Sequence, residues 1–335
     1  MDKKIVRTKM LDEAKRQSEG KRPLIEMLIF FLIMGIGSTV STLILYPAMM
    51  FYMYTDEKIV DIILGKTEFN SQTFIDAMTD FYANMPEWMS VLNLFSTVAI
   101  IIACVVYCRF IEKRSLASMG FRRHYAVLEY FVGIFIGIVL FGAVAGIGIV
   151  SGAFEYKGIS SFSIPMIIFY FLGYIIQGAS EEILIHGYYM TSVARKSDTF
   201  YSLFISSFVF ALLHFGNNGI NIIAFINLFL FGLLMGLYIL KRGNIWGICA
   251  IHSVWNFIQG NVMGLSVSGM DKSSSVFMFE IKEGYNLVTG GDFGPEGGLI
   301  VTLVLLIAVG LVKSLKTNKH EISDIIFEKE ETEAA

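Results

Sequence analysis

The side chains best suited to chemistry lie in three apolar stretches in the second half of the chain. Glu181 and Glu182 stand in the first stretch, His214 ends the second, and His252 and Asn256 lie four residues apart in the third. Ionisable side chains inside apolar stretches are costly, and they usually line a functional interior. A carboxylate suits proton transfer, and two donors on one helix face, such as His252 and Asn256, suit an oxyanion.

Helical spacing separates the two adjacent glutamates. Neighbouring helix positions diverge by about 100°, whereas positions four apart share a face. Glu182 shares its face with His186, which predicts a carboxylate–imidazole pair. Glu181 shares its face with Gln177 and remains available to a cavity, so it is the better candidate for a catalytic carboxylate.

The elements that carry these residues are predicted to be membrane-spanning helices. Of the 335 residues, 55% are hydrophobic and 16% are charged, and the mean hydropathy of +0.63 is too high for a soluble domain of ordinary composition. The sequence predicts an all-α fold, a polytopic transmembrane helix bundle of about eight spans. The stretches long enough to cross roughly 30 Å of hydrocarbon lie at 24–54, 90–111, 125–150, 163–192, 200–217, 219–240, 244–265 and 298–316.

The charges between these stretches predict the orientation of the chain. Lys and Arg gather in the N-terminal arm and in alternate connections, whereas the other connections are acidic or uncharged. Because cytoplasmic loops are enriched in Lys and Arg, both termini are predicted to be cytoplasmic in a multi-pass protein of the cell membrane. Residues 1–23 then form a cytoplasmic basic arm, 24–316 a single transmembrane domain, and 317–335 a cytoplasmic, disordered tail.

Depth along the predicted helices brings the polar residues to one level. Measured from the basic end of each stretch, Glu181, His214 and His252 all lie roughly 13–17 Å into the membrane at the helical rise. Asn256 lies about one turn farther outward. The common depth predicts one site, reached from the cytoplasmic side. The fifth stretch is expected to turn back at 215–218 before it crosses fully.

Taken in order, the motifs resemble the type II CAAX prenyl protease and bacteriocin-processing (CPBP, Abi) family of intramembrane proteases. The family pattern is E-E-x-x-x-R, then F-x-x-x-H, then H-x-x-x-N or H-x-x-x-D on successive core helices. This chain has Glu181-Glu182-x-x-x-His186, Phe210-x-x-x-His214 and His252-x-x-x-Asn256. His186 stands where the family usually has Arg, so any ion pair with its supporting partner Glu182 is expected to be weaker or dependent on pH.

The resemblance implies an intramembrane endopeptidase with its protease-like core at about 163–265. Glu181 would activate a water with His214, and His252 and Asn256 would stabilise the oxyanion. We expect no cofactor in this metal-free mechanism. The competing alternative is Zn²⁺ held by Glu181, His214 and His252, although the helical H-E-x-x-H spacing is missing.

The expected partners are the lipid bilayer and a peptide or lipidated-protein substrate. The resemblance implies CAAX-type processing, or maturation of and immunity to bacteriocin-like peptides. A net charge of −3, with basic residues confined to short clusters, does not predict a nucleic-acid partner. Two other classes remain open: a non-catalytic membrane immunity or scaffold protein that retains the motifs, and a proton-coupled transporter.

Overall fold

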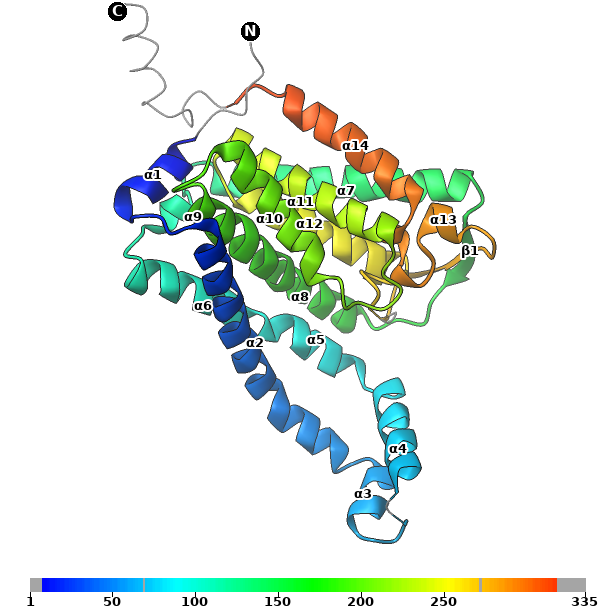
Figure 1. The fold of residues 1–335 in the computed structure, drawn as a ribbon. Helices are drawn as coiled ribbons and strands as arrows, with labels where there is room; N and C mark the ends of the chain where they lie inside the picture. The colour runs from blue at the N-terminus through cyan, green and yellow to red at the C-terminus, as the bar shows by residue number, and fades with distance from the viewer. Residues whose placement is uncertain (1–7, 69, 271–272, 318–335) are drawn as a thin grey trace, which may run out of the picture.

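The computed structural model of this chain describes residues 8–68, 70–270 and 273–317, so nearly all of the predicted tail lies outside the described residues. Most of its helices run side by side in one bundle (Figure 1). The helices at the eight predicted stretches are α2 (Pro23–Met53); α5 (Glu87–Ser96) with α6 (Val98–Val106) and η1 (Tyr107–Ile111); α7 (Ala126–Val150); α8 (Ile164–Glu182) with η3 (Ile183–Met190) and α9 (Thr191–Val193); α10 (Thr199–Leu213); α11 (Ile222–Arg242); α12 (Trp246–Phe257) with η4 (Ile258–Val262); and α14 (Leu299–Ser314).

Shorter elements occupy the two ends of the bundle and the connections between its helices. Most of them consist of one to three helical turns, and a single pair of strands is found among the described residues. These elements are α1 (Lys9–Gln17), α3 (Glu57–Ile63), α4 (Ser71–Ala83), η2 (Leu116–Met119), β1 (Phe154–Ile159), β2 (Phe277–Ile281), α13 (Asn286–Thr289), η5 (Gly291–Phe293) and η6 (Pro295–Gly297).

Helices occupy all eight predicted stretches, but the count of eight full spans is not confirmed. Two apolar helices, α10 and α14, are short. Helix α10 ends at Leu213 because the chain turns in the glycine-containing segment that follows, as the sequence predicts. Within the described residues, five helices are long and apolar enough to cross a membrane: Pro23–Met53, Glu87–Ile111, Ala126–Val150, Ile164–Val193 and Ile222–Arg242.

Polar side chains fix the points at which α10 and α11 begin. The carboxylate of Asp198 accepts a hydrogen bond from a backbone N–H in the first turn of α10. The Asn221 side chain accepts from the backbone N–H groups of Ile223 and Ala224, each at 2.9 Å. Such caps satisfy N–H groups that have no partner within the helix. Helix α11 therefore starts at Ile222, a short turn after His214.

A buried cluster of charges joins the helices at the basic end of the bundle. Arg195 Nη2 donates to Glu26 Oε1 at 2.8 Å and to Glu112 Oε1 at 2.6 Å, and Arg114 Nη1 donates to Glu112 Oε2 at 2.9 Å. The helix Lys9–Gln17 packs beside this cluster, so the described part of the N-terminal arm is folded. The cluster therefore connects the N-terminal segment and α2 to the end of the η3–α9 segment.

Glycines let α12 approach its two neighbours closely. A Cβ on Gly133 of α7 would lie 2.3 Å from the backbone oxygen of Gly247, and one on Gly178 of α8 would lie 2.7 Å from Ser253 Oγ. Small residues at such crossings permit close backbone packing where no hydrophobic effect drives helices together. The Gly178 contact brings the end of α8 next to His252, one position before Ser253.

Helices α2 and α5 diverge from the rest of the bundle along part of their length (Figure 1). They are connected at that end by α3 and α4. Ile59, Ala77 and Phe81 form a small buried apolar cluster there, separate from the main core. This segment is therefore folded but makes only a minor core of its own.

The outer connections of the second half are folded as well. Strands Phe154–Ile159 and Phe277–Ile281 pair antiparallel, which ties two distant connections together. Glu296 Oε2 accepts from Ser268 N at 2.6 Å and from Gln259 Nε2 at 3.2 Å, so the segment before α14 is held against η4, which continues α12. We call residues 266–297 the outer cover.

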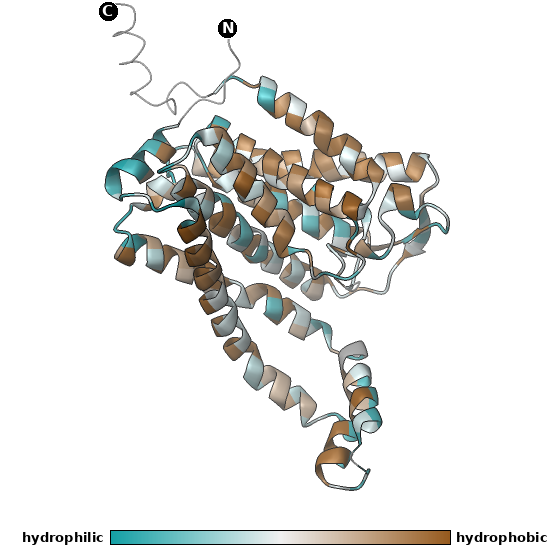
Figure 2. Cartoon of the chain, in the orientation of Figure 1, coloured by the Kyte–Doolittle hydropathy of each residue, from teal (hydrophilic) through white to brown (hydrophobic). Residues whose placement is uncertain are grey.

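The surface of the bundle is apolar where it would face lipid. Leu28, Phe131 and Phe135 are each more than 60% exposed, and many other large apolar side chains on these helices are exposed too. Figure 2 shows hydrophobic residues along the helices and hydrophilic residues gathered around α1 and in the connections. A surface of this kind is stable in a bilayer and not in water. The chain is a helical membrane protein.

The basic-end cluster gives a prediction about acid sensitivity. Burial raises the pKa of Glu112, but the guanidinium groups of Arg114 and Arg195 outweigh this effect and hold the pKa below its ordinary value of 4.5. A carboxylate with a lowered pKa stabilises the fold above its unfolded pKa, and this stability is lost as the pH falls through the folded pKa. We expect Glu112→Gln to lower the unfolding temperature in detergent at pH 7, with a loss of about 3–5 kcal/mol.

The gap between wild type and Glu112→Gln should narrow as the pH falls from about 4.5 through the lower pKa of the folded state, because the carboxylate is protonated first in the unfolded and then in the folded protein. Thermal unfolding of both proteins across a pH series measures this gap. The exposed Glu155 serves as a control, and Glu155→Gln should leave the unfolding temperature nearly unchanged at pH 7. A gap of constant size from pH 7 to pH 3 would contradict the prediction.

Candidate active site

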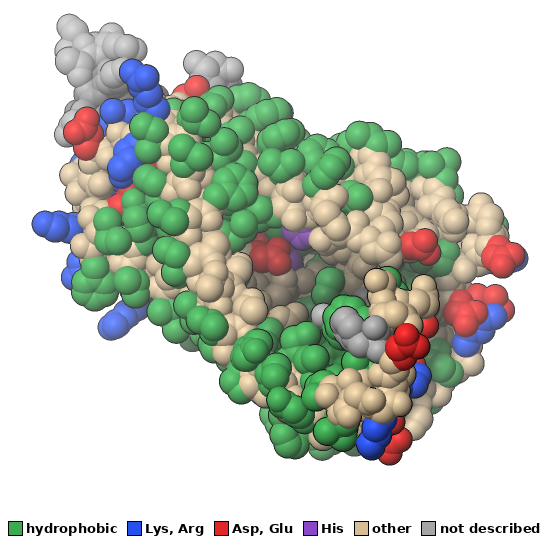
Figure 3. All heavy atoms as spheres, turned by 60° about the horizontal axis from the view of Figure 1, so that its bottom comes forward, with side chains coloured by type: hydrophobic (Ala, Val, Ile, Leu, Met, Phe, Trp, Pro, Cys, Tyr) green, Lys and Arg blue, Asp and Glu red, His purple; other side chains and the backbone are tan. Residues whose placement is uncertain are grey.

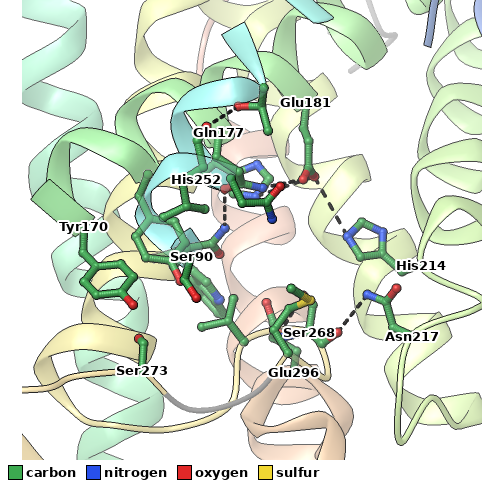
Figure 4. Close-up of a pocket in the computed structure, with 18 of the residues that line it drawn as sticks. Ser90, Tyr170, Gln177, Glu181, His214, Asn217, His252, Ser268, Ser273 and Glu296 are labelled. Carbon is green, nitrogen blue, oxygen red and sulfur yellow. Dashed lines mark hydrogen bonds and ion pairs between the residues drawn. The ribbon is translucent and has the colours of Figure 1, made fainter. Parts of the chain in front are cut away.

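Three helices bring the predicted site residues to one place inside the bundle. Glu181 and Glu182 end α8, where the backbone continues as the π-helix η3, and such segments are frequent at functional sites. His214 follows the last residue of α10, and His252 lies in the middle of α12. Figure 4 shows Glu181, His214 and His252 pointing toward one another.

Glu182 joins two of these helices through its two carboxylate oxygens. The side chain is fully buried, with Oε2 2.7 Å from His186 Nδ1 and Oε1 2.7 Å from His252 Nδ1. The spacing along the helix predicts the contact with His186. The contact with His252 was not predicted, because it joins two different helices. An ionised Glu182 accepts at both oxygens, so Nδ1 of His252 carries a proton and its Nε2 faces the site.

His186 stands where the family pattern has Arg, and both of its ring nitrogens have polar partners. Its Nδ1 faces the Glu182 carboxylate, and its Nε2 lies 3.0 Å from the backbone oxygen of Gly232 in α11. A carboxylate and a carbonyl oxygen can only accept hydrogen bonds. The ring of His186 therefore links Glu182 of α8 to the backbone of α11.

Gln177 links Glu181 to Asn256. The amide Nδ2 of Asn256 donates to Gln177 Oε1 at 3.1 Å, and Gln177 Nε2 donates to Glu181 Oε1. Only one of the two N–H bonds of Asn256 is used in this contact, so the other is available to a substrate. The sequence places Gln177 on the face of Glu181, but its bond to α12 depends on how the two helices pack.

Both remaining imidazoles turn their Nε2 atoms toward Glu181. His214 Nε2 and His252 Nε2 each lie 3.9 Å from Glu181 Oε2, which is too long for a direct hydrogen bond and leaves room for a bridging water. His214 Nδ1 donates to the backbone oxygen of Phe210 at 2.9 Å, so the neutral ring presents a lone pair at Nε2. Glu181 is 28% exposed and the two rings less so.

These groups border a cavity of about 870 Å³. Its wall includes residues of α2, α5, α8, α10, α11, α12 and α14, together with Val267, Ser268, Met270 and Ser273 of the outer cover. Figure 3 shows the hollow from outside, with acidic and histidine side chains at its bottom. A concave, mostly apolar cavity with a few converging polar groups is the usual form of a substrate site.

The cavity lies on one side of the site. Helix α8 contributes residues from Tyr170 to Glu181 and none beyond, and α12 contributes His252 to Asn256 and none before. Helix α11 likewise contributes residues only from its first half. The cavity therefore extends toward the acidic connections, away from the basic loops. The sequence predicts access from the basic side instead. The position of a residue along its helix gives its depth in the membrane, but it cannot tell which half of the bundle contains the cavity.

The geometry also bears on the zinc alternative. Among the residues that the structure describes, no group of three or more His, Cys, Asp or Glu side chains is arranged so that it could hold a metal ion. Glu181, His214 and His252 come together, with each Nε2 atom 3.9 Å from Glu181 Oε2. We therefore derive no chemical step through zinc.

Comparison with known proteins gives one match. Residues 162–258 match the family model described as type II CAAX prenyl endopeptidase Rce1-like. This segment is Rce1-like. It is less than a third of the chain, but it runs from the start of α8 to the end of α12 and contains Glu181, His214, His252 and Asn256. No curated protein and no solved structure matches the chain. The match confirms the family resemblance and supports protease activity in general.

Two cavity-lining glutamates outside the Rce1-like segment were not predicted from the sequence. Glu87 and Glu296 line the cavity, but they come from the start of α5 and from the outer cover, both outside the match. Glu87 lies at the start of an apolar helix, and a charged residue at that position is only a weak indication of a functional site. Glu296 lies in an irregular segment with no periodicity, so its position depends entirely on how the outer cover folds.

The two adjacent glutamates should differ in their effect on stability. Glu182 is fully buried and contacts two imidazoles at 2.7 Å, so Glu182→Gln disrupts a buried polar network and should cost about 3–5 kcal/mol. Glu181 is partly exposed and accepts a bond from a neutral amide, so Glu181→Gln should change stability by less than about 1 kcal/mol. Thermal unfolding of both variants in one detergent measures the difference. Equal losses for the two would contradict this division of roles.

The position of the cavity predicts the side of the membrane from which a reagent can reach it. Ser90 lines the cavity, and Lys196 is exposed at the basic end. We expect a membrane-impermeant maleimide to label Ser90→Cys in intact cells and Lys196→Cys only after permeabilisation. The unmodified protein is the control, because its three cysteines are buried. Labelling of Ser90→Cys only in opened cells would reverse the assignment of sides.

Proposed function

We propose that this chain is an intramembrane endopeptidase that uses Glu181 to activate a water molecule. The observation that carries the proposal is the convergence of one partly exposed carboxylate and two imidazole Nε2 atoms, each 3.9 Å from it, at the cavity. The Rce1-like match over 162–258 supports the same class of reaction.

In the proposed reaction, a water lies between Glu181 and the two rings. Glu181 takes a proton from the water as the water oxygen attacks the carbonyl carbon of the peptide bond. His214 orients the water or shares the proton, since its Nε2 lone pair faces the carboxylate. The fixed Nδ1 contact to Phe210 supports this role, because it holds the ring in one orientation.

The tetrahedral oxyanion would be stabilised by His252 and Asn256. For His252 to donate from Nε2, its ring must carry a second proton, and the Glu182 carboxylate at Nδ1 favours that charged form. Asn256 would donate with the amide hydrogen that Gln177 does not use. Donors that are already oriented before the reaction lower the barrier most.

The proton taken up by Glu181 then passes to the nitrogen of the leaving amine as the carbon–nitrogen bond breaks. The products are a carboxylic acid and an amine, and the second proton of the water then passes from the acid to the amine, which leaves a carboxylate and an ammonium group. Glu181 returns to its ionised form. No electron transfer or cofactor is needed for this balance. The division of the chain into a protease-like core at about 163–265 and flanking membrane helices is part of the proposal.

The test is a comparison of peptides in cells that carry the wild type, Glu181→Gln or Glu155→Gln. We expect substrates to accumulate with Glu181→Gln, whose activity should fall by at least about 10³-fold because the base is lost. His214→Ala should reduce activity by about 10²-fold. Glu155→Gln is the matched control, since Glu155 is exposed on β1 and distant in sequence from the site.

Two outcomes would overturn the mechanism. An unchanged peptide profile and phenotype in Glu181→Gln would favour the non-catalytic immunity or scaffold class. Activity of the purified protein that disappears with a chelator and returns with zinc alone would favour the metal mechanism over the proposed one.

A further inference from the structure

The outer cover contains a buried carboxylate that the proposed reaction does not use. Glu296 is only 8% exposed, and its Oε2 atom accepts from the backbone N–H of Ser268 at 2.6 Å, from the hydroxyl of Ser268 at 2.9 Å and from Gln259 Nε2 at 3.2 Å. Burying a carboxylate is costly unless such bonds compensate it. One oxygen of Glu296 thus connects both ends of the outer cover to η4.

These bonds hold Ser268 in an unusual backbone conformation. Its φ of +48° lies in the left-handed region, which residues other than glycine rarely adopt. Such a conformation costs energy and persists only where the surrounding structure fixes it. While the N–H of Ser268 donates to Glu296, its carbonyl oxygen accepts from Asn217 Nδ2 at 2.8 Å. Glu296 therefore fixes the position of the oxygen to which Asn217 binds.

Asn217 belongs to the turn that follows His214. Its side chain points at Ser268, beside His214 (Figure 4), and its backbone N–H donates to the His214 carbonyl oxygen at 3.0 Å. Most of the turn 215–219 is exposed, so contacts within the turn do little to fix its position. The bond to Ser268 gives the chain a fixed point three residues after His214.

Two glycines bring the same turn into direct contact with the outer cover. A Cβ on Gly219 would lie 2.6 Å from the backbone nitrogen of Phe293, and a Cβ on Gly269 would overlap the backbone oxygen of Asn218. Both glycines have positive φ, which glycine adopts without strain. The turn after α10 therefore rests on the outer cover through its backbone as well as through Asn217.

His214 depends on this turn because it lies at the end of α10. The helix ends at Leu213, and the last carbonyl groups of a helix have no partner within it. Helix ends fray, so contacts outside the helix must hold this one in place. Fraying here would break the bond from His214 Nδ1 to the Phe210 carbonyl oxygen, and Nε2 would no longer face Glu181.

Resting on the proposed endopeptidase function, we propose that Asn217 and Glu296 are positioning residues for His214. Glu296 fixes Ser268, and the carbonyl oxygen of Ser268 fixes Asn217. Asn217 in turn fixes the end of α10, so that the imidazole of His214 stays directed at Glu181. Glu296 lies outside the segment 162–258, so the orientation of a ring within the Rce1-like segment depends on the outer cover.

NMR of purified protein that carries ¹⁵N-labelled histidine tests this proposal. The chain has five histidines, and the signal that is missing in His214→Ala identifies His214. At about pH 8 an ordinary imidazole is neutral, and the wild-type ring should show a single tautomer with its proton on Nδ1. In Asn217→Ala we expect this single signal to be replaced by a mixture of both tautomers, because the bond to Phe210 is then broken part of the time.

Asn218→Ala is the matched control, because Asn218 lies in the same turn and is exposed. It should keep the wild-type signal of His214. An unchanged His214 signal in Asn217→Ala, or the same mixture in Asn218→Ala, overturns the proposal. Thermal unfolding of each variant shows that the comparison is made between folded proteins.

Variants of Glu296 test the other end of the same chain of contacts. Glu296→Ala should give the same mixture as Asn217→Ala, and combining the two should add little, because both break one series of bonds. Glu296→Gln should restore the single signal, since an amide oxygen at the position of Oε2 can accept the same bonds. A mixture in Glu296→Gln as large as in Glu296→Ala contradicts this role for Glu296. If Glu296→Ala does not fold, Asn217→Ala and Glu296→Gln decide the question.

Peptides in cells separate this inference from the function on which it rests. Peptides that accumulate with Glu181→Gln should also accumulate with Asn217→Ala, whose turnover should fall about tenfold because a misplaced group catalyses less well. Asn218→Ala should match the wild type. If Asn217→Ala changes the His214 signal but neither it nor Glu181→Gln changes the peptides, the endopeptidase proposal fails and the positioning contacts stand. If Glu181→Gln changes the peptides and Asn217→Ala does not, the endopeptidase proposal stands and the positioning role fails.

Discussion

The structure of the site depends on the buried carboxylate of Glu182. One oxygen contacts His186 of η3, the other contacts His252 of α12, and His186 in turn reaches a backbone carbonyl of α11. Removing charged groups from water is costly, so the arrangement is stable only while each charge keeps its partners. Relative rotation or sliding of these helices would break at least one contact. The same carboxylate therefore fixes the bundle core and the orientation of the ring that faces Glu181.

The two adjacent glutamates have different surroundings, although they are neighbours in the sequence. Glu182 faces the protein interior, where two imidazoles hold it. Glu181 points to the cavity, where its neighbours are a neutral amide and two rings at 3.9 Å. This separation is what the proposed reaction requires, because the carboxylate that would exchange a proton is not the one that holds the helices together.

The sequence predicts the features that depend on residues close together in the chain. The positions of the helices, the contact between Glu182 and His186, and the turn after α10 all follow from hydropathy, spacing and glycine in the sequence. The bridges from Glu182 to His252 and from Gln177 to Asn256 each join two helices, so they depend on relative rotation that no single helix encodes. The outer cover and the open side of the cavity were missed for the same reason, since contacts between distant segments form them.

Helix α10 has a consequence for the membrane itself. Its 15 residues give a length of about 22 Å, against roughly 30 Å for the hydrocarbon core of a typical bilayer. Helix α14, which also borders the cavity, has 16 residues. Hydrophobic mismatch of this size favours local thinning of the bilayer beside the cavity. The acyl-chain length of the surrounding lipids would then set how far water and peptide must travel to reach His214, which couples the site to membrane thickness.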